Sequence, residues 1–190
     1  MKSRDPAIAE GIRRGDPGAF DAFFDLYSGP ILAYLRGMVG DASLADDLLQ
    51  ETLLRVYRNI DRYEERGAFR AWVFRIATNL AVGEIRRRRY GSTDALDERA
   101  LEIPERDDLD PHQRLEDEER RRLVEAGLAT LAEEHRAVIL LRVREGMGVA
   151  EIARTLCVPE GTIKSRLHYA VHKLREFARK RESGCKGARE

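Results

Sequence analysis

The residues that could do chemistry in this chain gather on a short basic segment near its C-terminal end. Ser165, Tyr169 and His172 recur at intervals of four and three residues, so on an α-helix they share one face. Lys164 and Arg166 flank that face. Hydroxyl and cationic groups of this kind hydrogen-bond to the base edges and phosphates of DNA. The pattern therefore predicts a helix that enters a major groove.

Two short helices joined by a tight turn must position this face. The first shows apolar residues at i, i+3, i+4 and i+7, which are Val149, Ile152, Ala153 and Leu156. Pro159 is expected at the first position of the second helix, where its missing N–H costs nothing. The second helix presents an apolar stripe made of Ile163, Leu167, Ala170, Val171, Leu174, Phe177 and Ala178. The spacing favours a helix-turn-helix; the alternative is a helical hairpin in an ordinary core, whose charges are only a solvated surface.

Nothing else in the sequence has the spacing of a catalytic or metal site. We find no nucleophile–base pair, no glycine-rich phosphate loop and no zinc-ligand spacing. Cys157 and Cys185 form neither a disulfide framework nor a CxxC motif. We therefore expect no enzymatic activity, no cofactor and no bound metal.

The charges divide the chain into three segments, although the whole chain has a net charge of zero. Residues 1–90 carry 15 basic and 13 acidic side chains, residues 91–119 carry 3 and 12, and residues 120–190 carry 16 and 9. The middle segment has no sustained apolar period and reads as a linker. We expect an all-α protein with two small helical domains, at 1–90 and 120–182, joined by an acidic flexible linker at 91–119 and followed by a disordered tail at 183–190.

Hydrophobic runs in the sequence are short. The first residues, MKSRDPAIAEG, lack the apolar stretch of a signal peptide. AVILL at 137–141 is far too short to cross a bilayer. These features predict a cytoplasmic protein that makes no membrane contact of its own.

The N-terminal segment shows helical periodicity, with an aromatic cluster expected in the core. Asp5 and Asp16 each precede a proline, which is typical of a helix start, and Ser43 with Asp46 resembles a capping box. The sequence Ser28–Pro30 should kink or interrupt a helix. We expect helices at 6–14, 17–39, 44–60 and 69–89. The third should turn inward Leu48, Leu49, Leu53, Val56, Tyr57 and Ile60.

Two stretches carry a specific resemblance to a protein family. HRAVILLRVREGMGVAEIARTL, followed by EGTIKSRLHYAVHKLR, resembles region 4 of the sigma factors of bacterial RNA polymerase. Similar helix-turn-helices occur in LuxR-type regulators, so this half alone leaves the choice open. The run from Asp41 to Arg89 is similar to regions 2.1 to 2.4 of the small extracytoplasmic-function (ECF) sigma group, and this similarity decides between the two.

The resemblance implies three binding surfaces and their residues. Docking on the β′ clamp helices of core RNA polymerase would use Asp47, Gln50 and Glu51. Capture of the melted −10 strand would use Tyr63, Ile76, Asn79, Arg86, Arg87, Arg88 and Arg89. Recognition of the −35 duplex would use Lys164, Ser165, Arg166 and Tyr169. The alternatives are core packing for Ile76 and an ordinary surface position for Asn79.

The resemblance also implies partners beyond promoter DNA. These are the β flap of core polymerase and an anti-sigma factor that holds the protein inactive. The linker would either thread toward the RNA exit channel or act only as a tether. Gly83 stands where the family usually has an acidic residue, and Cys157 stands where it usually has glycine, so Cys157 is expected to be strained if the turn needs a positive φ. The rival functions are an autonomous DNA-binding regulator and a protein-interaction module.

Overall fold

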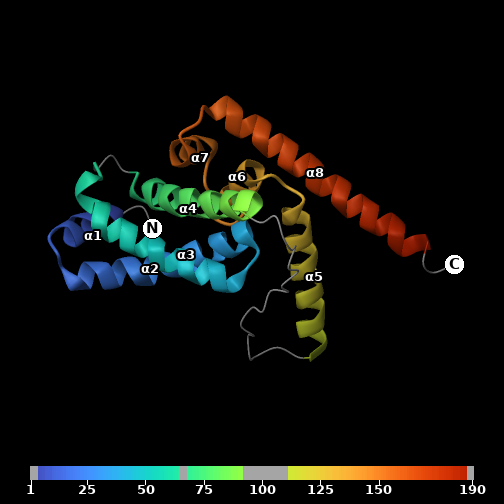
Figure 1. Cartoon of the computed structure of the whole chain (residues 1–190), viewed down its shortest axis with the longest axis horizontal. Helices are drawn as coiled ribbons and strands as arrows, with labels where there is room; N and C mark the ends of the chain where they lie inside the picture. The colour runs from blue at the N-terminus through green and yellow to red at the C-terminus, as the bar shows by residue number, and fades with distance from the viewer. Residues whose placement is uncertain (1–3, 65–67, 92–110, 188–190) are drawn as a thin grey trace.

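In the computed structural model, every regular element among the described residues, 4–64, 68–91 and 111–187, is helical. The N-terminal half contains α1 (Asp5–Arg13), α2 (Pro17–Val39), α3 (Ala42–Asn59), the 3₁₀ turn η1 (Ile60–Arg62) and α4 (Phe69–Gly91). The C-terminal half contains α5 (Pro111–Ala129), α6 (Glu133–Val143), α7 (Val149–Leu156) and α8 (Glu160–Gly187). The expected all-α class is confirmed (Figure 1).

Aspartates and a glycine set the ends of the early helices. The Asp16 carboxylate accepts a hydrogen bond from the Gly18 N–H at 2.9 Å and so caps α2. Gly40 ends α2 in the left-handed conformation, with φ of 71°. Asp41 then caps α3 through the Leu44 N–H at 3.0 Å. The predicted capping box at Ser43 is therefore wrong, because Asp41 lies closer to the turn and α3 begins two residues earlier than expected.

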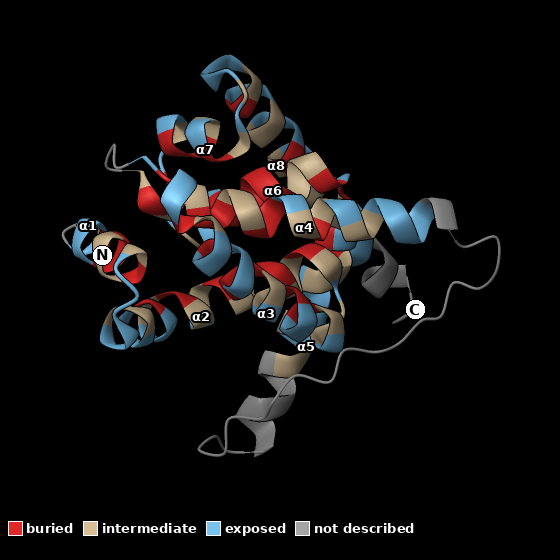
Figure 2. Ribbon diagram, turned by 60° about the vertical axis from the view of Figure 1, so that its left-hand side comes forward, coloured by how far each residue is buried: buried red, intermediate tan, exposed pale blue. Residues whose placement is uncertain are grey.

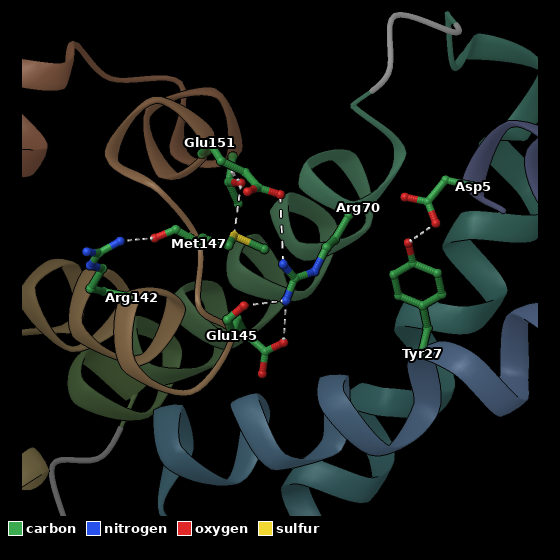
Figure 3. A network of polar contacts seen from close by, with 8 residues as sticks. Asp5, Tyr27, Arg70, Arg142, Glu145, Met147 and Glu151 are labelled. Carbon is green, nitrogen blue, oxygen red and sulfur yellow. Dashed lines mark hydrogen bonds and ion pairs between the residues drawn. The ribbon is translucent and has the colours of Figure 1, made fainter. Parts of the chain in front are cut away.

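Asp5 has a different role from the predicted helix cap. It lies inside the first turn of α1, is buried, and accepts a hydrogen bond of 2.7 Å from the Tyr27 hydroxyl (Figure 3). Burial of the phenol and the adjacent Asp5 carboxylate raise the Tyr27 pKa far above its usual value. This contact fastens α1 to α2, because a buried carboxylate and hydroxyl each need a partner.

The core of the N-terminal half is a set of interlocking aromatic rings. Phe69 lies at its centre, with ring centroids 5.9 Å from Phe23, 5.7 Å from Tyr27 and 5.4 Å from Tyr63. These three pairs meet edge to face, the arrangement that aromatic quadrupoles favour. The predicted aromatic core is confirmed. Tyr57, which was expected inside, is 53% exposed instead.

Helix α2 runs without interruption through Pro30. Of the two predicted effects of Ser28–Pro30, a kink or an interruption, the interruption is therefore wrong. The residues after the proline continue the buried face of the helix, with Ile31, Tyr34 and Leu35 fully buried. Tertiary packing on this face compensates for the main-chain hydrogen bond that a proline removes.

The helix-turn-helix is present in the C-terminal half, formed by α7 and α8. Cys157 ends α7 in the left-handed conformation with φ of 54°, so the turn does need the positive φ on which the expected strain at Cys157 depended. Pro159 precedes α8 rather than opening it, and its carbonyl accepts the N–H of Thr162 at 3.0 Å. Ile163 and Ala170 of α8 are fully buried, as their place in the apolar stripe predicted.

Helix α5 begins at Pro111, inside the range 91–119 that was assigned to the linker. Proline suits this first position because the first helical N–H groups have no partner within the helix. Residues 92–110 of the predicted linker, and the end of the predicted tail at 188–190, lie outside the described residues.

The two halves pack against each other. Helix α4 contacts α7, and α2 contacts α6, so α4 lies between the helix-turn-helix and the rest of the N-terminal half (Figure 1). Buried positions line α2, α4 and α6 where these helices meet (Figure 2). One hydrophobic core therefore joins helices from both halves.

We predict that Phe23→Ala lowers the free energy of unfolding by about 3–5 kcal/mol, because its ring is fully buried among other rings. Phe24→Ala provides a matched control, since the neighbouring ring is 45% exposed, and should cost less than about 1 kcal/mol. Urea unfolding followed by circular dichroism measures both. Equal losses for the two variants would contradict the arrangement of the aromatic core.

Candidate nucleic-acid interface

The outward face of α8 carries most of the side chains predicted to read duplex DNA. Lys164 and Ser165 are exposed, and the Ser165 hydroxyl donates to the Thr162 carbonyl at 3.0 Å. Tyr169 is 45% exposed. Its ring lies beside His135 of α6, with centroids 4.4 Å apart. These groups share a face because α8 is anchored by its opposite side.

Arg166 differs from its predicted neighbours. It is only partly exposed, since its position on the helix lies toward the side that packs on the C-terminal half. His168 is exposed instead, and it falls between Lys164 and His172 at intervals of four residues. The exposure of His168 was predictable from the sequence, because a helical spacing of 100° per residue places His168 on the same face as Lys164 and Ser165.

The residues of α4 that were predicted to bind the −10 strand differ in their exposure to solvent. Asn79 is exposed and Ile76 is partly buried, one turn apart on the same face. Trp72 continues this face toward the start of α4 and is also partly exposed. The sequence does not predict this exposure of Trp72, because an apolar stripe does not reveal which of its edges stays open to solvent.

Tyr63 is buried, with 6% of its surface exposed. Its ring packs against Trp72 at 5.1 Å between centroids. Tyr63 is therefore covered and contacts Trp72, whereas Ile76 and Asn79, the other two residues that the resemblance assigned to strand capture, are more exposed. Aromatic packing against Phe69 accounts for the difference.

Each arginine of the run at the end of α4 lies against a carboxylate. Arg86 and Arg89 donate to Glu133 at 3.1 and 2.9 Å. Arg87 donates to Glu84 at 2.8 Å. Arg88 donates to Glu84 at 3.1 Å and to Asp41 at 3.2 Å. All four side chains remain more than half exposed, so an incoming phosphate can reach them.

The predicted docking face of α3 is open. Asp47 and Gln50 are exposed, and Glu51 is partly exposed and accepts a hydrogen bond from Arg55 at 2.6 Å. Two large apolar side chains, Leu54 at 46% and Tyr57 at 53% exposure, follow on α3. Large exposed apolar side chains bordered by polar ones resemble the apolar centre and polar rim of a protein-binding surface. The sequence missed this apolar part because Tyr57 was placed in the core.

The described residues include neither a candidate metal site nor a candidate membrane-spanning helix. No group of three or more histidine, cysteine, aspartate or glutamate side chains among them is placed to hold a metal ion. Within the same part of the chain, no helix is both long and apolar enough to cross a membrane.

Comparison with known proteins agrees with this geometry. Residues 23–90 match the family model of sigma-70 region 2, and residues 127–176 match that of sigma-70 region 4. The ECF RNA polymerase sigma factor SigL of Mycobacterium tuberculosis is 36% identical over 174 residues, which cover 89% of this chain and 94% of SigL. The chain belongs to the ECF sigma factor family.

Two solved structures share the fold. The structure of CnrH in complex with the cytosolic domain of CnrY gives a TM-score of 0.70 at 22% identity and covers 92% of this chain and 96% of CnrH. The sigma factor RpoE of Bartonella quintana, in complex with the anti-sigma factor NepR, gives 0.67 at 23% identity and covers 84% and 96%. As an RNA polymerase sigma factor, the protein functions in transcription initiation.

In this sigma factor, Glu133 of region 4 holds two arginines of region 2. Its side chain is only 7% exposed. The backbone N–H of Glu133, together with the Arg86 and Arg89 guanidinium groups, holds the pKa of this carboxyl at about 2, although burial acts in the opposite direction. The carboxylate therefore remains charged throughout the physiological pH range.

The lowered pKa predicts a pH-dependent contribution to the stability of this sigma factor. A folded-state pKa below the ordinary 4.5 means that the ionised carboxylate stabilises the fold above about pH 4.5, and that this stabilisation is lost as the pH falls toward 2. Glu133→Gln should lower the free energy of unfolding at pH 7 by about 2 kcal/mol, and the gap to the wild type should shrink at pH 3. Urea unfolding at both pH values measures this, with Glu134→Gln as the control. A gap of the same size at both pH values would show that Glu133 is not the titrating group.

Proposed function

We propose that this sigma factor binds core RNA polymerase with α3, captures the melted −10 strand with α4, and reads the −35 duplex with α8. The observation that supports this proposal most strongly concerns α8. Fully buried residues, including Ile163 and Ala170, anchor one face of the helix, while the opposite face bears exposed cationic and hydroxyl groups. A helix held in this way is suited to a major groove.

For the −35 element, Lys164, Ser165 and Tyr169 are the proposed base-edge and phosphate contacts. Lysine bonds guanine O6 and N7, and a serine or tyrosine hydroxyl bonds either a base or a phosphate. Arg166 lies at the side of α8, and we assign it to the phosphate backbone beside the groove. His168 joins the outward face between these groups.

For the −10 element, the proposed surface is the open face of α4. The Asn79 amide offers both a donor and an acceptor to a base edge, and Ile76 gives an apolar contact beside it. Tyr63 supports this surface through Trp72. The strand phosphates would be bound by Arg86, Arg87, Arg88 and Arg89, each of which is more than half exposed.

For core polymerase, the proposed contacts are Asp47, Gln50 and Glu51 on the exposed side of α3, which would meet the β′ clamp helices. Carboxylate and amide oxygens accept charge-assisted hydrogen bonds from arginines of a partner. Leu54 and Tyr57 would add an apolar contact on the same helix. We assign contact with the β flap to the C-terminal half.

We also propose the remaining assignments, which family membership supports. The domains are region 2 at 1–90, a linker around 91–119 that contains the start of α5, and region 4 at 120–182. The protein initiates transcription without chemistry of its own and works in the cytoplasm. RpoE was solved with an anti-sigma factor, which supports the proposal that an anti-sigma factor also regulates this chain.

We predict that the double variant Gln50→Ala, Glu51→Lys abolishes co-purification with core polymerase, because it removes two acceptors and reverses a charge on α3. Binding of the variant to a −35 duplex should be unchanged, since α8 is untouched. Affinity capture with tagged core enzyme and a duplex binding assay measure the two effects. Retained co-purification would rule out this docking face, and Asp61→Lys outside it serves as a charge-matched control.

We also predict that Asn79→Ala reduces initiation on a duplex promoter about tenfold or more, but much less on a template that is already melted around −10. The amide contributes to holding an unpaired base, and a polar contact that stays unmade in the bound state costs about 1–3 kcal/mol. Run-off transcription on the two templates measures the ratio. Equal losses on both would argue against strand capture by Asn79.

A further inference from the structure

Arg13, in the last turn of α1, donates hydrogen bonds to two main-chain carbonyls at η1. Its Nη2 atom lies 2.8 Å from the Tyr63 carbonyl oxygen and 3.5 Å from the Ile60 carbonyl oxygen. The Ile60 carbonyl also accepts the Tyr63 N–H at 3.0 Å, which closes η1. Carbonyls at a helix end lack a partner within the helix and carry partial negative charge. The Arg13 cation therefore holds the main chain where it leaves η1.

A carboxylate of the same helix sets the direction of the Arg13 side chain. Glu10 accepts a hydrogen bond of 2.6 Å from Nη1 of Arg13, while Nη2 reaches Tyr63. The guanidinium group is planar and its donors form a rigid fork, so a bond at one nitrogen restricts where the other nitrogen points. Hydrogen bonds from Arg13 and Arg14 lower the pKa of the Glu10 carboxyl, which therefore stays ionised at neutral pH.

Helix α1 is itself fixed to α2, so it can serve as a support. The Tyr27 hydroxyl of α2 donates to the buried Asp5 carboxylate at 2.7 Å (Figure 3). The two helices also approach closely, because a Cβ added at Gly11 would lie only 2.4 Å from the Ala19 Cβ. The apolar face of α1 lies in the core, with three buried residues, Ile8, Ala9 and Ile12.

This support lies before the part of the chain that defines the family domain. The match to sigma-70 region 2 begins at residue 23, whereas α1 ends at Arg13. The family resemblance therefore assigned no role to α1. Its contact with η1 nevertheless joins it to a residue that the resemblance assigned to strand capture, because the carbonyl that Arg13 holds belongs to Tyr63.

The Tyr63 ring carries this contact on to the open face of α4. Its centroid lies 5.1 Å from the centroid of the Trp72 ring. Trp72 is partly exposed, Ile76 follows one turn later on α4, and Asn79 is exposed three residues beyond. Because closely packed rings leave little free space, a shift of the Tyr63 main chain would also move the indole that rests on its ring.

We propose that Arg13 is a positioning residue for capture of the −10 strand. It holds the Tyr63 main chain, and the Tyr63 ring in turn holds Trp72 on the face of α4 that bears Ile76 and Asn79. The role in strand capture rests on the proposed function, whereas the positioning of Trp72 by Arg13 does not.

Three variants of the full chain test this role. Arg13→Ala removes both bonds to η1. Arg13→Lys keeps a cation that can reach the Tyr63 carbonyl, but a single ammonium group cannot reproduce the planar fork between Tyr63 and Glu10. Arg14→Ala is the matched control, because Arg14 is the next residue, bonds the same Glu10 at 2.9 Å and has a side chain that is 75% exposed. Circular dichroism first establishes that all three retain the helical content of the wild type.

The position of Trp72 is measured by its own fluorescence, because it is the single tryptophan of the chain. Arg13→Ala should move the emission to longer wavelength and increase quenching by acrylamide, a neutral quencher that does not respond to the lost charge. Arg14→Ala should match the wild type, and Arg13→Lys should lie between the two. Identical emission and quenching in Arg13→Ala and the wild type would overturn the positioning role, whatever the protein does with polymerase.

The role in strand capture is measured by run-off transcription with core polymerase. Arg13→Ala should reduce initiation on a duplex promoter about three- to tenfold, as expected for the loss of one charge-assisted hydrogen bond, and much less on a template already melted around −10. Co-purification with core polymerase should be unchanged, since α3 is untouched. Unchanged initiation on the duplex, or equal losses on both templates, would overturn this role.

Failure of the proposed function gives a different result. If Asn79→Ala loses equally on both templates while Arg13→Ala still shifts the Trp72 emission, strand capture by this face is wrong and the positioning of Trp72 by Arg13 stands. If Asn79→Ala behaves as predicted but Arg13→Ala initiates like the wild type on the duplex, the proposed function stands and the contribution of Arg13 to it is wrong.

Discussion

An arginine that leaves water must keep hydrogen-bond acceptors, because its charge cannot be removed by deprotonation and an unpaired buried charge costs several kcal/mol. This constraint governs how the two halves of the sigma factor meet. Arg70 and Arg136 are largely covered, and each is aimed at carbonyl oxygens near a helix end. The last carbonyls of a helix have no partner within the helix and carry partial negative charge. Helix ends on one half therefore serve as acceptors for the cations of the other.

Burial acts differently on the carboxylates that meet these arginines. Glu145 is desolvated enough that burial raises its pKa despite the Arg70 ion pair. At Glu133 the balance is reversed, because a backbone N–H and two arginines outweigh burial and lower the pKa. The two pairs therefore contribute differently to the interface. Arg70 with Glu145 fixes the geometry at a high desolvation cost, whereas Glu133 is a stable anion placed against cations that remain accessible.

Sequence periodicity was enough to predict the helices and the inner face of most of them. Apolar residues at three- and four-residue spacing identified α7 and α8, whereas the question of a left-handed turn at Cys157 arose only from the resemblance, because the family usually has glycine at this position. It was harder to predict which of two neighbouring residues takes a given role. Asp41 and Ser43 are both good caps, and only the turn at Gly40 decides between them. Likewise, Tyr57 lies at the edge of an apolar stripe, where a small rotation of the helix about its axis decides whether a side chain is buried or exposed.

The contacts between the halves could not be predicted from spacing at all. Arg70 and Glu145 are 75 residues apart, and Arg136 and Met38 are 98 residues apart, so no local period connects them. A glycine such as Gly37 inside a helix reads only as a weak point in helix propensity. In the structure, the absence of a side chain at Gly37 lets α6 pack closely against α2. The burial of Tyr63 was likewise not predictable from spacing, because it depends on ring packing against Phe69 and Trp72.

One turn of α6 links the parts of the molecule that we assign to DNA. Glu133 bonds the arginines at the end of α4, His135 stacks on Tyr169 of α8, and Arg136 bonds the Met38 carbonyl at the end of α2. Coupling between distant sites requires an element with two arrangements that both sites bias. The structure shows α6 in one arrangement, in which neighbouring residues of a single turn contact α2, α4 and α8 at once, so a displacement of this turn would disturb all three contacts together.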